Sequence, residues 1–296
     1  MWLFFALLTP FFWASVHVMD SHCVKEVFDK PWLGMVTSAL ASMVVFLILP
    51  FLIPFVNWHV PEWSIIGIAL LAGAFIQLSQ VFYFQALAYS EAGIVAAYWN
   101  LTPALLPVAS FFFLDQILEV PEYMGIGILI FSSVCFCLLD TNFALRWRSL
   151  FLMLGASVFQ VAALLLEDRV YQEESYVIGF FLVTIGLILT GIFPLVVPSA
   201  LKVFRNNLPA LRPAMGILVG IEVMNLFALA SSQRAIDLGV PSLVAAVETM
   251  VPAYTFLLAL LLLSLMPRFG DPLASSYLLQ KFGLVGVMVG GVWLLS

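Results

Sequence analysis

Ten long apolar runs limit the folds open to this sequence. They fall near residues 2–20, 33–56, 64–89, 93–114, 122–140, 149–168, 176–200, 214–236, 241–265 and 277–295. Each run approaches the roughly 20 residues that an α-helix needs to cross the hydrocarbon core of a bilayer. The apolar residues are continuous rather than alternating, which favours helices over barrel strands. The longest connections are predicted at 21–32, 201–213 and 266–276, so no separate soluble domain is expected.

Composition excludes the soluble classes of protein. Hydrophobic residues make up 64% of the chain and charged residues 9%, whereas a soluble domain is about 45–50% apolar and about 25% charged. The net charge is −6 and no basic stretch is present, so no nucleic-acid partner is expected. We therefore expect an all-α polytopic membrane protein with ten transmembrane helices. Because no basic leader precedes the run that starts at Trp2, this run is predicted to be the first span of the chain.

The sequence also repeats itself. Residues 90–103 resemble residues 239–252, with the tripeptide Val-Ala-Ala in both. Pro103 recurs as Pro252 at the same separation of 149 residues as this tripeptide. A shared separation between matching prolines and small residues indicates an internal repeat rather than a chance likeness of apolar segments.

The repeat divides the chain into two halves of five helices, residues 1–145 and 146–296, which are expected to form one integrated membrane domain. Because five is odd, the second half enters the membrane from the opposite side. The halves are therefore predicted to be inverted repeats. Many secondary transporters are built in this way, with the substrate site near the midplane between the repeats.

Three motifs resemble the EamA type of the drug/metabolite transporter superfamily. Residues 12–15, Phe-Trp-Ala-Ser, are similar to the Trp-Gly or Trp-Ala start of that family. Residues 84–88, followed by 96–97 and Pro103, are similar to its signature across the third and fourth helices. Residues 113–118 resemble its Leu-Gly-Glu loop, with Asp and Gln in place of Gly and Glu. The resemblance implies a ten-helix transporter of the bacterial cytoplasmic (inner) membrane and does not identify its cargo.

Two arguments about orientation disagree. Of the 11 Lys and Arg residues, all but Arg169 and Arg234 are predicted on the face opposite the termini. The positive-inside rule then places both termini outside, whereas the resemblance implies termini inside. We follow the charge count and expect both termini outside.

Polar residues within the apolar runs are candidates for lining a central cavity. A carboxylate inside a membrane span is costly and usually faces a cavity or a partner. Glu222 lies deep in the eighth run and Glu248 in the ninth, and Asn225 shares a helical stripe with Glu222. The alternative for each glutamate is a neutral side chain that hydrogen-bonds a neighbouring helix.

Two prolines focus this prediction. A proline within a helix cannot donate a hydrogen bond to the carbonyl four residues earlier. Pro103 therefore leaves the Trp99 carbonyl without this bond, and Pro252 leaves the Glu248 carbonyl without it. Such carbonyls are tolerated at membrane depth only where protein, water or ligand satisfies them. Trp99 and Glu248 are therefore predicted to line one cavity, with lipid contact or packing as the alternative for Trp99. The full predicted substrate-binding set is Trp99, Glu248, Glu222, Tyr98, Asn100, Thr249, Asn225, Gln77, Trp13 and His17.

Further polar residues occupy the first and sixth helices. Asp20, Glu167 and Gln160 are gate or proton-coupling candidates, because an aqueous vestibule would explain polar side chains there. Interfacial anchoring is the alternative for Asp20. His22 lies off the face shared by His17 and Asp20, so no metal site is expected, and no motif indicates a cofactor.

The last run contains Gly286 and Gly290, a pair of small residues four apart. Such a pair predicts close helix packing within the protein, with a homodimer contact as the alternative. We expect a monomer or a weak homodimer.

These features together predict a secondary-active transporter of a small organic metabolite that works by alternating access. The mid-span acidic residues have no mid-span Lys or Arg partner, which favours a cationic or amine-bearing substrate. An aromatic wall would add about 0.5–2 kcal/mol of cation–π attraction. A bound proton could neutralise the carboxylates instead, so proton-coupled export of neutral or hydrophobic compounds stays open.

Two other classes of protein are weighed against a transporter. The first is a membrane-embedded lipid-modifying enzyme that uses His17 and Asp20, which few catalytic groups and short loops disfavour. The second is a membrane partner that transports nothing, which the inverted repeat disfavours. No phosphate-binding motif supports an ATPase, and no catalytic residue is predicted.

Overall fold

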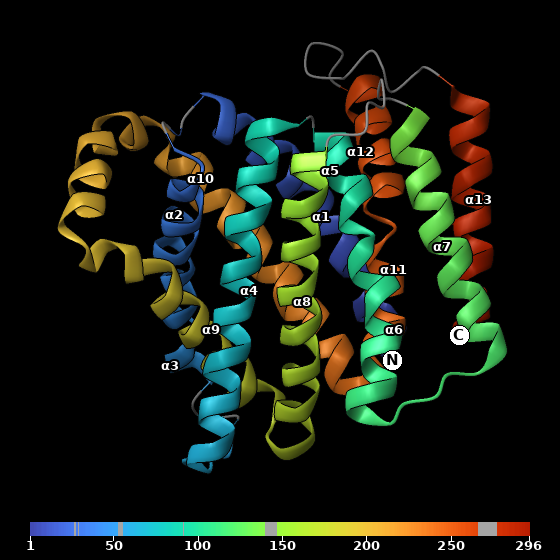
Figure 1. Cartoon of the computed structure of the whole chain (residues 1–296), viewed down its shortest axis with the longest axis horizontal. Coiled ribbons are helices and arrows are strands. Elements are labelled where there is room, and N and C mark those ends of the chain that lie inside the picture. Colours follow the sequence, from blue (N-terminus) through green and yellow to red (C-terminus); the bar gives the residue numbers. More distant parts are fainter. Residues whose placement is uncertain (27, 29, 53–55, 91, 140–146, 266–276) are drawn as a thin grey trace.

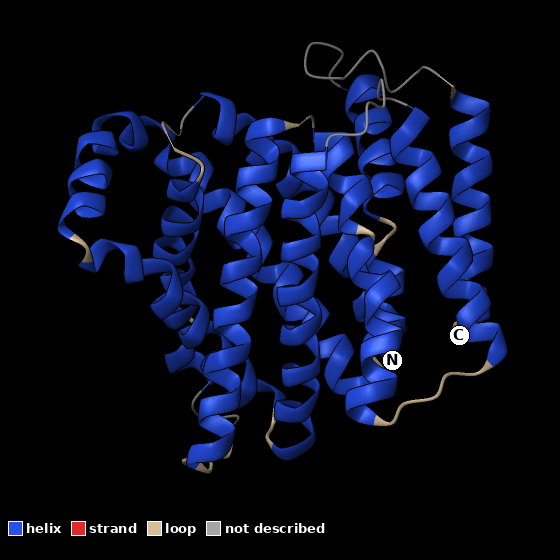
Figure 2. Cartoon of the chain, in the orientation of Figure 1, coloured by secondary structure: helices blue, strands red, loops and turns tan. Residues whose placement is uncertain are grey.

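The computed structural model describes residues 1–26, 28, 30–52, 56–90, 92–139, 147–265 and 277–296, and within them every regular element is a helix (Figures 1 and 2). The helices are α1 (Trp2–Glu26), α2 (Trp32–Ser42), α3 (Leu49–Leu52), α4 (Trp63–Tyr89), α5 (Ala92–Trp99), α6 (Leu101–Leu114), α7 (Val120–Leu139), α8 (Trp147–Glu173), α9 (Tyr176–Ile192), α10 (Pro198–Leu238), α11 (Pro241–Glu248), α12 (Val251–Leu265) and α13 (Leu278–Leu294). Short 3₁₀ segments, η1 (Met43–Leu47) and η3 (Phe193–Val196), continue α2 and α9.

The helices form a membrane-spanning bundle. In the described residues, 8 segments are long and apolar enough to cross a membrane, and two shorter apolar helices, Trp2–Val16 and Leu278–Leu294, accompany them. These segments match the ten runs expected from the sequence. The chain is an all-α polytopic membrane protein, and this prediction is confirmed.

Both termini lie toward the same end of the bundle, at the lower side of Figure 1, which we call the terminal end. The main helix packing joins segments far apart in sequence. Helix α4 packs against α8 and α9, α1 packs against α10, and α7 packs against α13. The early and late parts of the chain therefore share one interior.

Two membrane segments are interrupted where the prolines predict. Helix α5 ends at Trp99 and α6 begins at Leu101, while α11 ends at Glu248 and α12 begins at Val251. The broken helices predicted from Pro103 and Pro252 are therefore confirmed. The last residue before each break, Trp99 in α5 and Glu248 in α11, is half-buried.

The residues at the two breaks make the same hydrogen bonds. At the first break, the backbone N of Asn100 lies 3.4 Å from the Ala97 carbonyl oxygen, and its side-chain Nδ2 lies 3.1 Å from the same atom. At the second, the backbone N of Thr249 lies 3.2 Å from the Ala246 carbonyl oxygen, and its Oγ1 lies 2.7 Å from it. Each side chain thus satisfies a carbonyl that an unbroken helix would have paired.

Two details differ from the sequence prediction. Residues 201–213, expected as a connection, are helical within α10. Asn207 and Leu211 lie one turn apart and are both buried, so this segment packs one face onto the bundle.

The close packing expected at Gly286 and Gly290 is wrong for the described part of the chain, since nothing there lies within 4 Å of a Cβ built at either position. The neighbouring Gly291 faces α7 instead, where a Cβ would meet Leu129 at 3.0 Å.

Helices α4 and α9 approach each other through Gly73 and Gly186. A Cβ built at Gly73 would lie 1.9 Å from the Val183 carbonyl oxygen, and one at Gly186 would lie 2.2 Å from that of Leu70. These distances leave space for hydrogen atoms only. Close approach through small residues is a common way for membrane helices to associate.

We expect Gly73→Ala to reduce stability by about 1–3 kcal/mol, because the added methyl group forces two backbones apart. Thermal unfolding of the purified protein in detergent measures this effect. Gly67→Ala is the matched control, since it lies on the same helix with no described atom within 4 Å of its Cβ position. Equal unfolding temperatures for the two variants would contradict the close approach.

Candidate functional site

Two cavities meet in the middle of the bundle. Their volumes are about 70 Å³ and about 30 Å³. Both are lined by Trp13 of α1, Trp99 of α5 and Gln160 of α8. We treat them as two chambers of one cavity and name them after their carboxylates, the Glu222 chamber and the Glu248 chamber.

The Glu222 chamber lies among α1, α2, α4, α9 and α10. Glu222 is 3% exposed and accepts hydrogen bonds from Ser42 Oγ at 2.5 Å, Ser38 Oγ at 2.7 Å and Asn225 Nδ2 at 3.4 Å. These three donors are neutral, so they orient the carboxylate without supplying an opposite charge. Helix α2 contributes both serines because they lie four residues apart on one face.

Helix α4 contributes a buried amide to the same chamber. Gln77 is 0% exposed, and its Nε2 donates a hydrogen bond to the Met35 carbonyl oxygen at 2.8 Å. Its Oε1 is buried and has no hydrogen-bond partner among the described residues. Gln77 therefore brings a buried acceptor with unmet hydrogen-bonding capacity to the wall of this chamber.

The Glu248 chamber lies between the two helix breaks. Glu248, the last residue of α11, accepts a hydrogen bond from Ser232 Oγ of α10 at 2.5 Å. Thr102 lines the opposite side from α6, and its buried Oγ1 is unpaired within the described part of the chain. None of the described residues that line either chamber is Lys or Arg. The cavity therefore contains two carboxylates and no described basic side chain.

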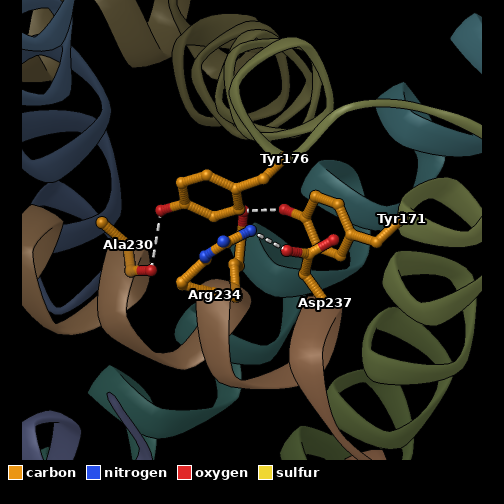
Figure 3. Close-up of polar contacts among 6 residues, drawn as sticks. Tyr171, Tyr176, Ala230, Arg234 and Asp237 are labelled. Carbon is orange, nitrogen blue, oxygen red and sulfur yellow. Dashed lines mark hydrogen bonds and ion pairs between the residues drawn. The ribbon is translucent and has the colours of Figure 1, made fainter. Parts of the chain in front are cut away.

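A polar network lies at the terminal end of the bundle, where α8 and α10 finish and α9 starts. We call it the terminal-end cluster, and it comprises Glu167, Tyr171, Tyr176, Gln233, Arg234 and Asp237. Gln233 Nε2 donates to Glu167 Oε1 at 2.6 Å, and the Tyr171 hydroxyl donates to Gln233 Oε1. Figure 3 shows the Tyr176 hydroxyl directed at the Ala230 carbonyl, 2.8 Å away, and Arg234 directed at Asp237. These bonds join α8, α9 and α10.

Ser232 and Gln233, which are adjacent on α10, connect this cluster to the cavity. Ser232 binds Glu248 in the cavity, whereas Gln233 binds Glu167 in the cluster. A shift of α10 would therefore affect both carboxylates.

The structure brings most of the predicted site residues together. The following predicted residues line one or both chambers: Trp13, Gln77, Trp99, Asn100, Gln160, Glu222, Asn225, Glu248 and Thr249. Tyr98 does not line either chamber and is buried in an apolar cluster, because consecutive helical residues diverge by about 100°. Glu167 belongs to the terminal-end cluster. The side chains of His17 and Asp20 lie outside the described residues.

The sequence prediction missed several hydroxyl partners. Ser38, Ser42 and Ser232 bind the two glutamates, and Thr102 and Ser133 line the Glu248 chamber. Serine and threonine are common in membrane helices, so their presence alone carries little information. The four-residue spacing of Ser38 and Ser42 is the one signal that could have identified a polar face on α2.

Comparison with known proteins supports the resemblance found in the sequence. The model of the EamA-like transporter family matches residues 1–138. Among 28 matching chains of solved structures, one described as a crystal structure of a protein has a TM-score of 0.61 and 16% sequence identity. The match covers 98% of this chain and 97% of that chain, and at this identity it shows a shared fold alone. No curated protein matches.

The terminal-end cluster leads to a stability prediction. Tyr171→Phe removes the hydroxyl that pairs with Gln233 and leaves a buried amide oxygen unsatisfied, so we expect a loss of about 1–3 kcal/mol. Thermal unfolding in detergent measures it. Tyr123→Phe, at a side chain 43% exposed on α7, is the control and should leave the unfolding temperature unchanged. An unchanged temperature for Tyr171→Phe would show that this hydrogen bond contributes little to stability.

Proposed function

We propose that this chain, whose residues 1–138 match the EamA-like transporters of the drug/metabolite transporter superfamily, is a secondary-active transporter of a small cationic or amine-bearing metabolite. The family match indicates a multi-pass membrane transporter rather than an enzyme. One observation supports the proposed positive charge of the substrate: Glu222 and Glu248 line a central cavity to which no described Lys or Arg contributes.

Charge balance favours a cationic substrate. An ionised carboxylate removed from water is costly unless an opposite charge or strong hydrogen bonds compensate it. The described partners of Glu222 and Glu248 are hydroxyls and an amide, which are neutral. A substrate amine would supply the missing positive charge. Trp13 and Trp99, on the walls of both chambers, would add cation–π attraction.

Alternating access requires two parts that rock around the site, and the helix packing supports the two proposed inverted repeats, residues 1–145 and 146–296. In this scheme α1, α2 and α4 correspond to α8, α9 and α10. The contact between α4 of the first repeat and α8 of the second then has a counterpart in the contact between α10 of the second repeat and α1 of the first. Both contacts are extensive. The hydrogen bonds of Asn100 and Thr249 at the two breaks also correspond.

The terminal-end cluster is a suitable gate. The lining of the Glu222 chamber includes Phe28, two residues after α1 ends, and Gly34, in the first turn of α2. The C-terminal end of α1 lies on the side of the bundle opposite the termini (Figure 1). The cluster seals the other end through the bonds from Gln233 to Glu167 and from Tyr176 to Ala230. Opening the terminal end would require these bonds to break as α10 moves against α8 and α9. Glu167 therefore keeps its proposed gating role, while Gln160 belongs to the cavity wall.

Replacing Glu248 tests the substrate charge. Glu248→Gln keeps the side-chain size and can still pair with Ser232 but removes the negative charge. We expect it to reduce uptake of amines into proteoliposomes by at least about tenfold, with an unfolding temperature close to that of the wild type. Glu119→Gln, at an exposed carboxylate, is the control and should transport normally.

The same variant separates the proposal from proton-coupled export of a neutral compound. That alternative predicts that Glu248→Gln stops the response of transport to a pH gradient while neutral compounds remain the preferred substrates. Wild-type rates and a wild-type response to pH in Glu248→Gln would reject a charged role for this residue altogether.

Trp99 provides an independent test of the cavity wall. Trp99→Leu should weaken amine binding by about 1–2 kcal/mol, because it removes the ring face and its cation–π attraction. Binding to purified protein, measured by titration calorimetry, gives this value directly. Trp147→Leu, at a ring 61% exposed on α8, is the matched control. Equal losses in both variants would show that Trp99 has no specific contact with the ligand.

A further inference from the structure

The two carboxylates of the cavity lie far apart along the bundle. Glu222 and Ser232 are both on α10, ten residues apart, which corresponds to about 15 Å along a helix axis. Glu248 is held at 2.5 Å from Ser232. A single ammonium group therefore cannot contact both glutamates at once.

Each chamber also contains a second polar atom in need of a partner. Gln77, 0% exposed, lines the Glu222 chamber and has a buried Oε1 without a partner among the described residues. Thr102, 3% exposed, lines the Glu248 chamber and has a buried Oγ1 that is likewise unpaired within the described part of the chain. A buried polar atom without a partner is destabilising, so a ligand that supplies the missing donor is favoured. An ammonium group carries three donors and no acceptor, so one group can bind a carboxylate and a neighbouring oxygen together.

The connection between the chambers is narrow and aromatic. Trp13, Trp99 and Gln160 line both chambers, whose volumes of about 70 Å³ and about 30 Å³ leave little room for a bulky ring system. The indole faces suit methylene groups as well as cations. A slender unbranched chain is the shape that matches two small chambers joined in this way.

We propose that the transported solute has two positive ends, as in a long alkyl diamine or a polyamine. One ammonium group binds Glu222 and Gln77 Oε1, the other binds Glu248 and Thr102 Oγ1, and the methylene chain passes between Trp13 and Trp99. This inference rests on the proposed function, and it adds that both chambers are filled by one molecule. Binding at two linked sites raises the affinity, because the second contact forms within the same complex.

A series of linear amines tests the proposal on the purified wild-type protein. Titration calorimetry would compare diaminoalkanes of increasing length with monoamines and neutral diols of the same length. We expect long diamines to bind at least about tenfold more tightly than the matched monoamines. We also expect affinity to peak at the chain length that spans the two chambers, and diols not to bind.

Substitutions then show whether one end of the ligand binds in the Glu222 chamber. Glu222→Gln should lower the affinity ratio of long diamines to matched monoamines toward one, whereas Glu119→Gln, at an exposed carboxylate, should leave this ratio at its wild-type value. Equal affinity of diamines and monoamines at every length in the wild type would overturn the two-ended ligand and leave the amine transporter standing. Absence of binding by every amine would reject both. The wild-type comparison decides the question even if Glu222→Gln fails to fold.

Discussion

Backbone hydrogen bonding within the bilayer is the constraint on which the rest of this structure depends. Without water, a break in a membrane helix exposes carbonyl groups that must find other partners. Here Asn100 and Thr249 return hydrogen bonds to the carbonyls of Ala97 and Ala246 at the two breaks. These bonds satisfy the carbonyls of Ala97 and Ala246. The carbonyls of Trp99 and Glu248, whose helical donors Pro103 and Pro252 remove, lie where α5 and α11 end next to a cavity.

The charge arrangement follows from this geometry. Glu248 stands at one break, and Glu222 lies on α10, the helix that also carries Ser232 and Gln233. Neutral donors hold both carboxylates, so a ligand that carries positive charge gains more here than it would beside an arginine. Ser232 donates a hydrogen bond to Glu248, and the adjacent Gln233 donates one to Glu167 in the terminal-end cluster. A ligand that displaces Glu248 could therefore act on α10 and on the bonds of that cluster. Binding and gating can therefore be linked through one helix.

Much of the fold could be predicted from the sequence, because span length and proline position are local properties. The ten runs and the breaks before Pro103 and Pro252 followed from such patterns. The same patterns selected Glu222, Glu248 and Trp99, which line two neighbouring chambers in the structure. The partners of these residues did not follow from such patterns, since Ser38 and Ser42 meet Glu222 only through packing of α2 on α10. Tyr98 lines neither chamber, because consecutive helical residues such as Tyr98 and Trp99 point about 100° apart. The helical course of residues 201–213 depends on burial of one face against the bundle, which no local pattern shows.

The central claim is that a positively charged group binds between Trp99 and the cavity carboxylates. The most direct measurement is an experimental structure of the protein in a lipid nanodisc with a bound linear amine, using the tightest binder found by calorimetry. The account predicts density that runs through both chambers, with an amine nitrogen within about 4 Å of the Glu248 carboxylate. An amine bound elsewhere on the protein, with the cavity occupied by lipid or water, would contradict it.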